Sequence, residues 1–470
     1  MSAHRSGGVS LTKHIGLWFR DVLIRRKSMN ATRIVAGGFA IIILLGTLLL
    51  MLPVASQSGQ SAGFLTSLFT ATSATCVTGL VPVDTGMSWT FFGQLVIILL
   101  IQVGGLGFMT VLSLFSLLLR RRIGLSERLI MASTLNLNDM DGVVRVVRHA
   151  LMVTFTLEGI GAVVLSTRFI PQFGLVGGIW RGIFHAISAF CNAGFDLVGG
   201  KFGAFTSLEG YNNDPLVLGT IMVLIVSGGL GFFVWEDILR SRSWKGFSFY
   251  TKMVISVTAG LLIGGMVFFL CVEYNNPATF GSMPLPQKML NALFQSVTLR
   301  TAGFASFNQG GLLDSSIVVS CVLMLIGGSS GSTAGGLKTV TAALLLLSLR
   351  ANLAGREQVT IRGRAISYRK VIDAMTLALI IVFLFMTGSI LISLVDGVPY
   401  LHAAFETASA LGTVGVTVGI TPTLSPVSHV ILICLMYLGR IGVLTFSMAF
   451  LTRNRYPAKI KYPNLDIMIG

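Results

Sequence analysis

The sequence predicts an all-α membrane protein of four tandem repeats, with eight transmembrane helices and four short re-entrant helices around a pseudo-fourfold axis. Three observations lead to this prediction. The 470-residue chain is 53% hydrophobic and only 11% charged, whereas soluble domains carry about 25% charged residues. Its basic residues gather in five segments between pairs of apolar stretches, and a Phe-to-Gly motif occurs four times.

The five basic segments hold 27 of the 34 Lys and Arg residues. They lie at or before Arg33, in 120–148, in 240–252, in 350–370 and after Leu451. A net charge of +16 could attract nucleic acid, but this placement is the positive-inside pattern of membrane proteins. We therefore expect a multi-pass plasma-membrane protein with cytoplasmic termini, contacts to anionic membrane lipids and no nucleic-acid partner.

Each interval between basic segments contains two apolar stretches long enough to cross a hydrocarbon core of about 30 Å. The eight predicted spans are 33–55, 89–119, 145–170, 215–239, 251–273, 315–349, 370–395 and 427–451. They predict a basic N-terminal segment, four pore repeats, here called units one to four, and a C-terminal tail. These parts are 1–32, 33–122, 145–242, 251–350, 369–452 and 453–470.

Between the two spans of every unit lies a partly apolar stretch that is too short to cross and is therefore expected to be re-entrant. The four stretches read LFTATSATCVTGL, IFHAISAFCNAGF, LFQSVTLRTAGF and AFETASALGTVGV. In each, a Phe precedes a Gly by nine or ten residues: Phe69 and Gly79, Phe184 and Gly194, Phe294 and Gly303, Phe405 and Gly415. These glycines are 115, 109 and 112 residues apart, a regular period typical of internal repeats.

Non-helical backbone at membrane depth is tolerated where it is buried in protein or lines a watery cavity. Four Gly-containing turns around one axis would supply rings of carbonyl oxygens, which can replace the hydration shell of a monovalent cation. Glycine allows the backbone angles that a Cβ would obstruct. The short helices are thus predicted to be pore helices around a central pore. The alternative is that they are ordinary re-entrant turns packed between helices.

The second spans carry glycines at matching depth: GGLGF begins at 104 and at 228, and GRIG begins at 439. In unit three the corresponding stretch is GGSSGSTAGG, with five glycines, three serines and a threonine in 327–336. Such a composition does not favour a helix, so we expect a mobile loop beneath the four turns. The alternative is a kink that permits close helix packing. Lys338, just after it, is expected to extend toward the inner interface.

Two arginines in apolar surroundings need partners. Arg440 lies near the middle of the last span, where inserting a charged side chain into the membrane costs about 2.5–3.5 kcal/mol. It is expected to face the interior, to oppose cation passage and to hold the loop through its carbonyls, or else to pair with Glu158. Arg300, directly before TAGF, is expected to pair with an acid such as Glu406.

Six acidic residues could form an outer vestibule that concentrates cations, or could each be a solvated loop residue. They are Asp84, Asp196, Glu209, Asp214, Asp314 and Asp396.

Nothing in the sequence predicts an enzyme. The six histidines are scattered, and no HExxH, GxSxG or P-loop motif is present. The main alternative is a secondary transporter of another monovalent cation or small solute with a midplane site. That architecture predicts inverted two-part symmetry, not four repeats in one orientation.

The motifs CVTGL, CNAGF, RTAGF and TVGVT, joined to paired spans, resemble the Ktr/Trk/HKT superfamily of potassium transporters over essentially the whole chain. The resemblance is greatest to the KtrB-type pore subunit, since Trk-type subunits carry two extra spans before the first repeat. It implies K⁺ uptake in the bacterial inner membrane through one pore, with glycine in all four turns giving potassium preference. The implied selectivity-filter residues are Val77, Thr78, Gly79, Asn192, Ala193, Gly194, Thr301, Ala302, Gly303, Thr413, Val414 and Gly415.

The same resemblance implies a gate and partners. The gate would be the intramembrane loop together with Arg440, namely Gly327, Gly328, Ser329, Ser330, Gly331, Ser332, Thr333, Ala334, Gly335, Gly336 and Arg440. The partners would be a second copy of the chain, its C-terminal tail at the dimer interface, and a cytosolic KtrA-type ring that binds nucleotide. No cofactor is implied in this chain; K⁺ would be the transported ion and Na⁺ an activator or coupling ion.

Overall fold

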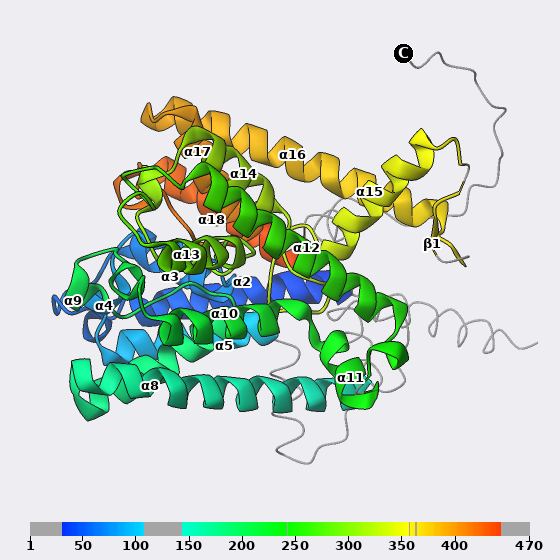
Figure 1. The fold of residues 1–470 in the computed structure, drawn as a ribbon. Helices are drawn as coiled ribbons and strands as arrows, with labels where there is room; N and C mark the ends of the chain where they lie inside the picture. Colours follow the sequence, from blue (N-terminus) through cyan, green and yellow to red (C-terminus); the bar gives the residue numbers. More distant parts are fainter. Residues whose placement is uncertain (1–30, 108–142, 242, 357, 362–363, 443–470) are drawn as a thin grey trace, which may run out of the picture.

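The computed structural model describes residues 31–107, 143–241, 243–356, 358–361 and 364–442. The predicted basic segment before residue 31, the end of unit one, the tail 453–470 and the position of both termini lie outside these residues. The described chain is helical, with one small hairpin in which β1 (Thr360–Ile361) pairs antiparallel with β2 (Arg364–Ala365). Figure 1 shows the long helices running side by side across the molecule. The hairpin and α11 (Phe232–Ser241) lie at one end, and α4 (Thr85–Ser88) and α9 (Gly199–Phe202) lie at the other.

The predicted first spans correspond to long apolar helices. They are α2 (Ala31–Leu50), the first part of α8 (Val143–Phe190), α12 (Phe249–Val272) and α16 (Tyr368–Asp396). These four are long and apolar enough to cross a membrane, and α10 with α11 make a possible fifth. α2 ends before the predicted boundary because Pro53 starts the short η1 (Pro53–Ala55) and has no N–H for the helix ladder.

A short helix stands at the predicted place in each unit. These are α3 (Phe64–Thr75), the part of α8 after Gly174, α13 (Leu285–Thr298) and α17 (Tyr400–Gly412). α8 contains both a span and its short helix, separated at Gly174, where φ is +76°.

The predicted second spans are less regular. They appear as α5 (Phe91–Leu106), α10 (Pro215–Leu230) with α11 (Phe232–Ser241), α14 (Asp314–Leu325) with α15 (Thr339–Leu353), and α18 (Pro426–Ile441). The span predicted over 215–239 is not one straight helix, because α10 and α11 are bent by 94° at Gly231. Gly231 has φ +91°, a conformation that glycine adopts without a Cβ clash.

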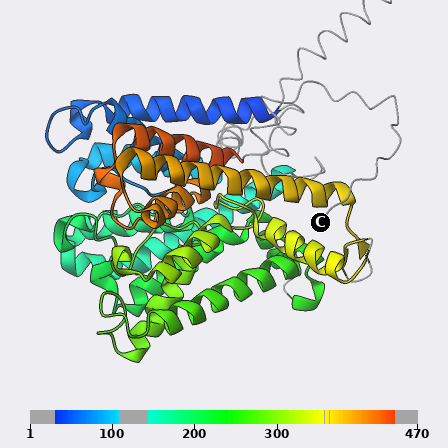
Figure 2. The same ribbon diagram turned by 90° about the horizontal axis from the view of Figure 1, so that it is seen from above.

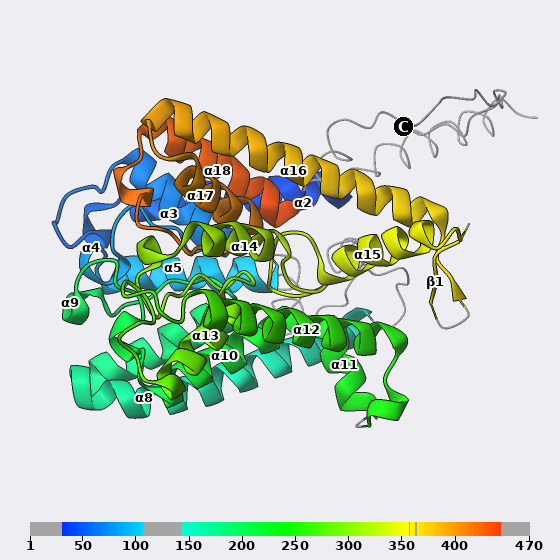
Figure 3. The ribbon, with the colours of Figure 1, turned by 45° about the horizontal axis from the view of Figure 1, so that its top comes forward.

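The units contact one another in a closed order. α5 packs on α8, α10 on α13, α14 on α17, and α18 on α3 of unit one. Figures 2 and 3 show the closure: α2 and α18 lie side by side, with α8, α10 and α12 on the other side of the molecule. The Tyr437 hydroxyl also donates to the Ala36 carbonyl across this junction, at 2.8 Å.

The four motif phenylalanines hold this order together. All four are fully buried, and each belongs to the hydrophobic cluster that contains the second helix of the preceding unit. Phe184, for example, clusters with Ile97 and Ile101 of α5, and Phe69 clusters with Leu432 and Leu435 of α18. Burying an aromatic ring at each junction stabilises the contact by about 2–3 kcal/mol, which explains why the Phe recurs.

The repeated glycines of the second helices permit close packing on the short helices. A Cβ on Gly104, Gly228 or Gly439 would overlap the carbonyl oxygen of Thr75, Phe190 or Leu411. Each of those carbonyls belongs to the residue four positions before the motif glycine of its unit. The GGLGF repetition therefore reflects backbone contact at the same level in units one, two and four.

Candidate functional site

The four Gly-containing turns have the same unusual backbone. The residue two positions before each glycine has a positive φ: 56° at Val77, 60° at Asn192, 69° at Thr301 and 52° at Thr413. The glycines themselves have φ between 72° and 101°. A left-handed conformation at a β-branched residue is strained, so its recurrence at Val77, Thr301 and Thr413 marks a geometry that the surrounding structure enforces.

The four turns meet one another in a ring. A Cβ on Gly79 would fall on the Ala193 carbonyl, one on Gly194 on the Ala302 carbonyl, one on Gly303 on the Val414 carbonyl, and one on Gly415 on the Thr78 carbonyl. Each turn thus presses its glycine against the turn of the next unit, and the fourth closes on the first. Besides the glycines, the residues brought together are Thr78, Ala193, Ala302 and Val414.

Hydroxyl groups brace the turns from the short helices. Ser73 accepts a hydrogen bond from the Gly79 N–H at 3.0 Å, and Ser409 accepts one from the Gly415 N–H at 2.9 Å. In the other two units, Ser188 donates to the Phe195 carbonyl at 2.7 Å and Thr298 donates to the Phe304 carbonyl at 2.6 Å.

These bracing residues were not predicted from the sequence. A signal was available, since Ser73, Ser188, Thr298 and Ser409 each stand four residues after the motif Phe of their unit.

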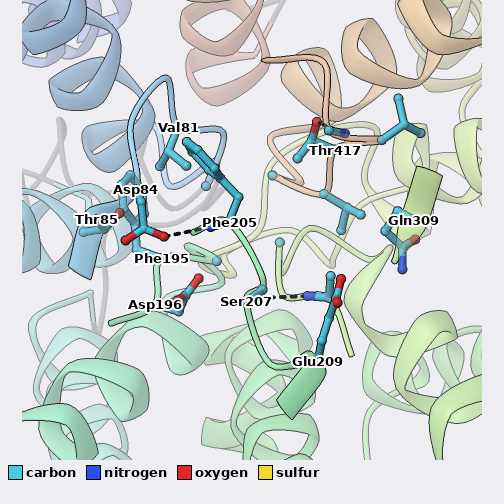
Figure 4. Close-up of a pocket in the computed structure, with 18 of the residues that line it drawn as sticks. Val81, Asp84, Thr85, Phe195, Asp196, Phe205, Ser207, Glu209, Gln309 and Thr417 are labelled. Carbon is cyan, nitrogen blue, oxygen red and sulfur yellow. Dashed lines mark hydrogen bonds between the residues drawn. The ribbon is translucent and has the colours of Figure 1, made fainter. Parts of the chain in front are cut away.

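A cavity of about 150 Å³ lies on one side of the ring, and all four glycines contribute to its lining. Figure 4 shows Asp84, Asp196 and Glu209 around it. Desolvation by the surrounding loops and, next, the charge of Asp84 raise the pKa of Asp196 to about 7. Asp84 accepts hydrogen bonds from the Met87 and Phe205 N–H groups, which fixes its carboxylate.

Only those three of the six predicted vestibule acids line the cavity. Asp214 caps α10 and lies 3.4 Å from Arg168 Nε. Asp396 accepts from the Ser425 N–H at 3.1 Å. Asp314 is the first residue of α14.

The glycine- and serine-rich stretch of unit three lies on the other side of the ring. It is non-helical between α14 and α15, and it contacts the residues that precede the glycines: Gly335 packs against Thr413, and Gly327 against Thr301.

The middle of this stretch is held by the break between α10 and α11. Ser329 N–H donates to the Gly229 carbonyl at 3.0 Å, and Phe232 N–H donates to the Gly331 carbonyl at 2.9 Å. Thr333 Oγ1 donates to the Phe190 carbonyl at 3.2 Å, which ties the same stretch to the end of α8.

Arg440 donates to backbone carbonyls around this stretch. Its guanidinium hydrogen-bonds the carbonyls of Thr333, Gly104 and Gly105, the last at 3.1 Å. The alternative pairing with Glu158 is not found: the Glu158 carboxylate accepts from Gln102 Nε2 at 3.1 and 3.3 Å.

Two other side-chain predictions are wrong. Arg300 does not pair with Glu406, whose carboxylate accepts from Thr417, Thr421 and the Val418 N–H. Lys338 was expected to extend toward the inner interface; its ammonium instead donates to the Ala334 carbonyl of the loop at 2.7 Å. Backbone carbonyls freed by the non-helical stretch are available to these cations, which sequence spacing does not reveal.

A membrane protein that handles cations is expected to have features such as these: a ring of Gly-containing turns, a cavity with three carboxylates and a loop held by an arginine. Residues 6–456 match the family described as TrkH, cation transport protein. The chain therefore belongs to this family of cation transport proteins, and the resemblance drawn from the sequence is confirmed.

Particular relatives are similar over nearly the whole chain. The potassium/sodium uptake protein NtpJ of Enterococcus hirae is 41% identical over 450 residues, 95% of this chain and 98% of the relative. The Ktr system potassium uptake protein B of Bacillus subtilis is 39% identical over 451 residues, 96% and 99% of the two chains. The potassium transporter TrkH of Vibrio parahaemolyticus has a similar fold, with a TM-score of 0.69 at 17% identity over 90% of this chain and 85% of that one.

Proposed function

We propose that this chain takes up K⁺ across the cell membrane through a single pore, with the four glycine turns as its selectivity filter. The observation that carries the proposal is the closed ring in which Gly79, Gly194, Gly303 and Gly415 each face a carbonyl of the neighbouring turn. Rings of carbonyls can replace the hydration shell of K⁺. Relatives named as potassium or potassium/sodium uptake proteins support the choice of ion.

In this proposal the four units, each a span, a pore helix, a filter turn and a second span, surround the pore with pseudo-fourfold symmetry. The acids of the cavity attract cations from outside. The cyclic packing of the units supports the arrangement, because each short helix is held by its own unit and the preceding one.

The loop 327–336 is the proposed gate. Its contacts with Thr301 and Thr413 put it close under two of the proposed filter turns, and Arg440 holds it through the Thr333 carbonyl. A fixed cation at that level also opposes the passage of K⁺. Opening then requires the loop to leave Arg440 and the break between α10 and α11.

The remaining parts of the proposal rest on the family. We propose that the chain works as a homodimer in the bacterial inner membrane, with both termini in the cytoplasm and the tail 453–470 at the dimer interface. A cytosolic KtrA-type ring that binds nucleotide would regulate it, and Na⁺ would activate or couple transport. Similarity to the Ktr system protein B of Bacillus subtilis supports this part.

The filter assignment is tested by Gly303→Ser and Gly415→Ser in cells that lack their own K⁺ uptake systems. Each serine Cβ would overlap a neighbouring carbonyl, so selective K⁺ uptake should fall by about tenfold or more relative to Na⁺. Gly200→Ser is the matched control, because a Cβ there meets no atom within 4 Å. Wild-type discrimination between K⁺ and Na⁺ in both filter variants would contradict the assignment.

A further inference from the structure

Arg300 is a buried cation with a specific set of partners. Only 7% of the residue is exposed. Its Nη2 donates to the Gly327 carbonyl at 3.1 Å and lies 2.9 Å from the Thr339 hydroxyl oxygen. Burying a guanidinium without such partners would cost several kcal/mol, so the two contacts of Nη2 stabilise the buried charge.

Gly327 and Thr339 form the base of the loop, where the chain leaves α14 and enters α15. The base is closed by backbone hydrogen bonds: Gly327 N–H to the Leu337 carbonyl at 2.9 Å, and Thr339 N–H to the Gly328 carbonyl at 3.0 Å. The Thr339 hydroxyl also donates to the Gly327 carbonyl at 3.0 Å. Arg300 thus bonds both chain segments of the base, one at Gly327 and the other at Thr339.

The base is also next to the third turn of the ring. Arg300 directly precedes Thr301, one of the residues with positive φ, and stands two positions before Ala302, whose carbonyl faces Gly194. A Cβ on Gly327 would lie 3.3 Å from Thr301 Cγ2, so the base lies beside the turn.

The loop is therefore held at two places by two different arginines. Arg440 bonds the middle of the loop at Thr333, whereas Arg300 bonds the base at Gly327 and Thr339. Of these two attachments, the one at the base adjoins the third turn of the ring, because Arg300 directly precedes Thr301.

We propose that Arg300 is a positioning residue that fixes the base of the loop to the third filter turn, so that this turn keeps its K⁺-binding geometry while the rest of the loop moves. The proposal rests on the assignment of the turns as filter and the loop as gate. It predicts that loosening the base alters K⁺ binding, whereas loosening the middle alters only the amount of K⁺ that passes.

The test compares Thr339→Val with Thr339→Ser in the whole chain, measuring the KM and maximal rate of K⁺ uptake and the inhibition of uptake by Na⁺. Valine removes the hydroxyl but keeps the shape, and serine keeps the hydroxyl. Because a hydrogen bond to a charged group is lost, KM for K⁺ should rise by about tenfold in Thr339→Val and stay near wild type in Thr339→Ser. Ser348→Ala on the same helix, which removes a hydroxyl bonded to the Leu344 carbonyl away from the base, should leave KM unchanged.

Arg300→Lys gives an independent arm, since one ammonium does not reproduce the planar donor set of the guanidinium. It should raise KM and weaken discrimination against Na⁺. Equal KM values for Thr339→Val and Thr339→Ser, or wild-type KM in Arg300→Lys, would overturn the proposal. If Gly303→Ser and Gly415→Ser change selectivity while these variants do not, the filter assignment stands and only the role of Arg300 fails. If neither serine variant has an effect, the filter assignment itself fails.

Discussion

The four turns have nearly the same structure as one another, whereas the four second helices do not. At the ring, every unit supplies the same two positive-φ positions and the same contact with its neighbour. One level away, only Gly231 separates α10 from α11 in unit two, whereas in unit three the thirteen non-helical residues 326–338 separate α14 from α15. The proposed filter needs equivalent members around one ion, whereas the proposed gate is a segment that unit two does not share.

The largest expected effect comes from disturbing the close packing of a glycine on the short helix, which the second helices of units one, two and four share. Gly104→Ala should destabilise the protein by about 2–3 kcal/mol, because its Cβ overlaps the Thr75 carbonyl and the backbone there has little room to move. Gly159→Ala is the matched control, since that helix position has no atom within 4 Å of a Cβ. Thermal unfolding in detergent measures both, and equal transitions would show that close packing at this level is unimportant.

The next effect concerns the loop 327–336 of unit three. Arg440→Gln removes the charged donor to the Thr333 and Gly104 carbonyls. The loop should leave its closed position more often, raising the maximal K⁺ uptake rate by up to about tenfold without changing KM. The maximal uptake rate of Arg440→Lys should lie between those of the wild type and Arg440→Gln, because lysine keeps the charge but not the forked geometry of the guanidinium. A decrease in maximal uptake in Arg440→Gln would argue against a restraining arginine.

A smaller effect tests the equivalence of the turns. Ser409→Ala removes the acceptor of the Gly415 N–H, at a cost of about 1 kcal/mol, and should reduce discrimination between K⁺ and Na⁺ by about fivefold. Ser389→Ala removes a buried hydroxyl of α16 that bonds the Phe385 carbonyl, away from the turn. Equal selectivity in the two variants would mean that the hydroxyl braces are dispensable.

The smallest effect concerns the cavity. Because the pKa of Asp196 is raised to about 7, its carboxylate is mostly neutral at pH 6 and mostly charged at pH 8. Uptake at K⁺ concentrations well below KM should therefore rise by about twofold from pH 6 to pH 8, as the charge that attracts cations forms. Asp196→Asn should remove this rise. A pH dependence that persists unchanged in Asp196→Asn would assign it to another group.

The sequence predicted those parts of the molecule that repeat. The spacing of Phe and Gly predicted four short helices and four turns, and the composition of 327–336 predicted a stretch without helix. In the structure the Phe rings are buried between units and the glycines adjoin neighbouring carbonyls. Only a large apolar side chain fills the space between units, and only glycine fits beside a neighbouring carbonyl, so few residue types can occupy these positions.

The parts that do not repeat were harder to predict. The letters GGLGF predicted close-packed glycines in unit two but not the 94° bend between α10 and α11 at Gly231. The contact of Arg440 with a loop carbonyl was expected, but Arg300 and Lys338 bond carbonyls of the non-helical stretch, and such partners leave no mark on residue type. The hydroxyls four residues after each Phe could have been found by comparing the four stretches position by position.

The central claim is that the ring formed by the four turns binds K⁺ through backbone oxygens. Anomalous diffraction from crystals grown with Rb⁺ in place of K⁺ tests it most directly. We expect an anomalous peak on the axis between the carbonyls of Thr78, Ala193, Ala302 and Val414, weakened in Gly303→Ser. A well-ordered wild-type ring with no peak there, or with Rb⁺ bound only elsewhere, would contradict the claim.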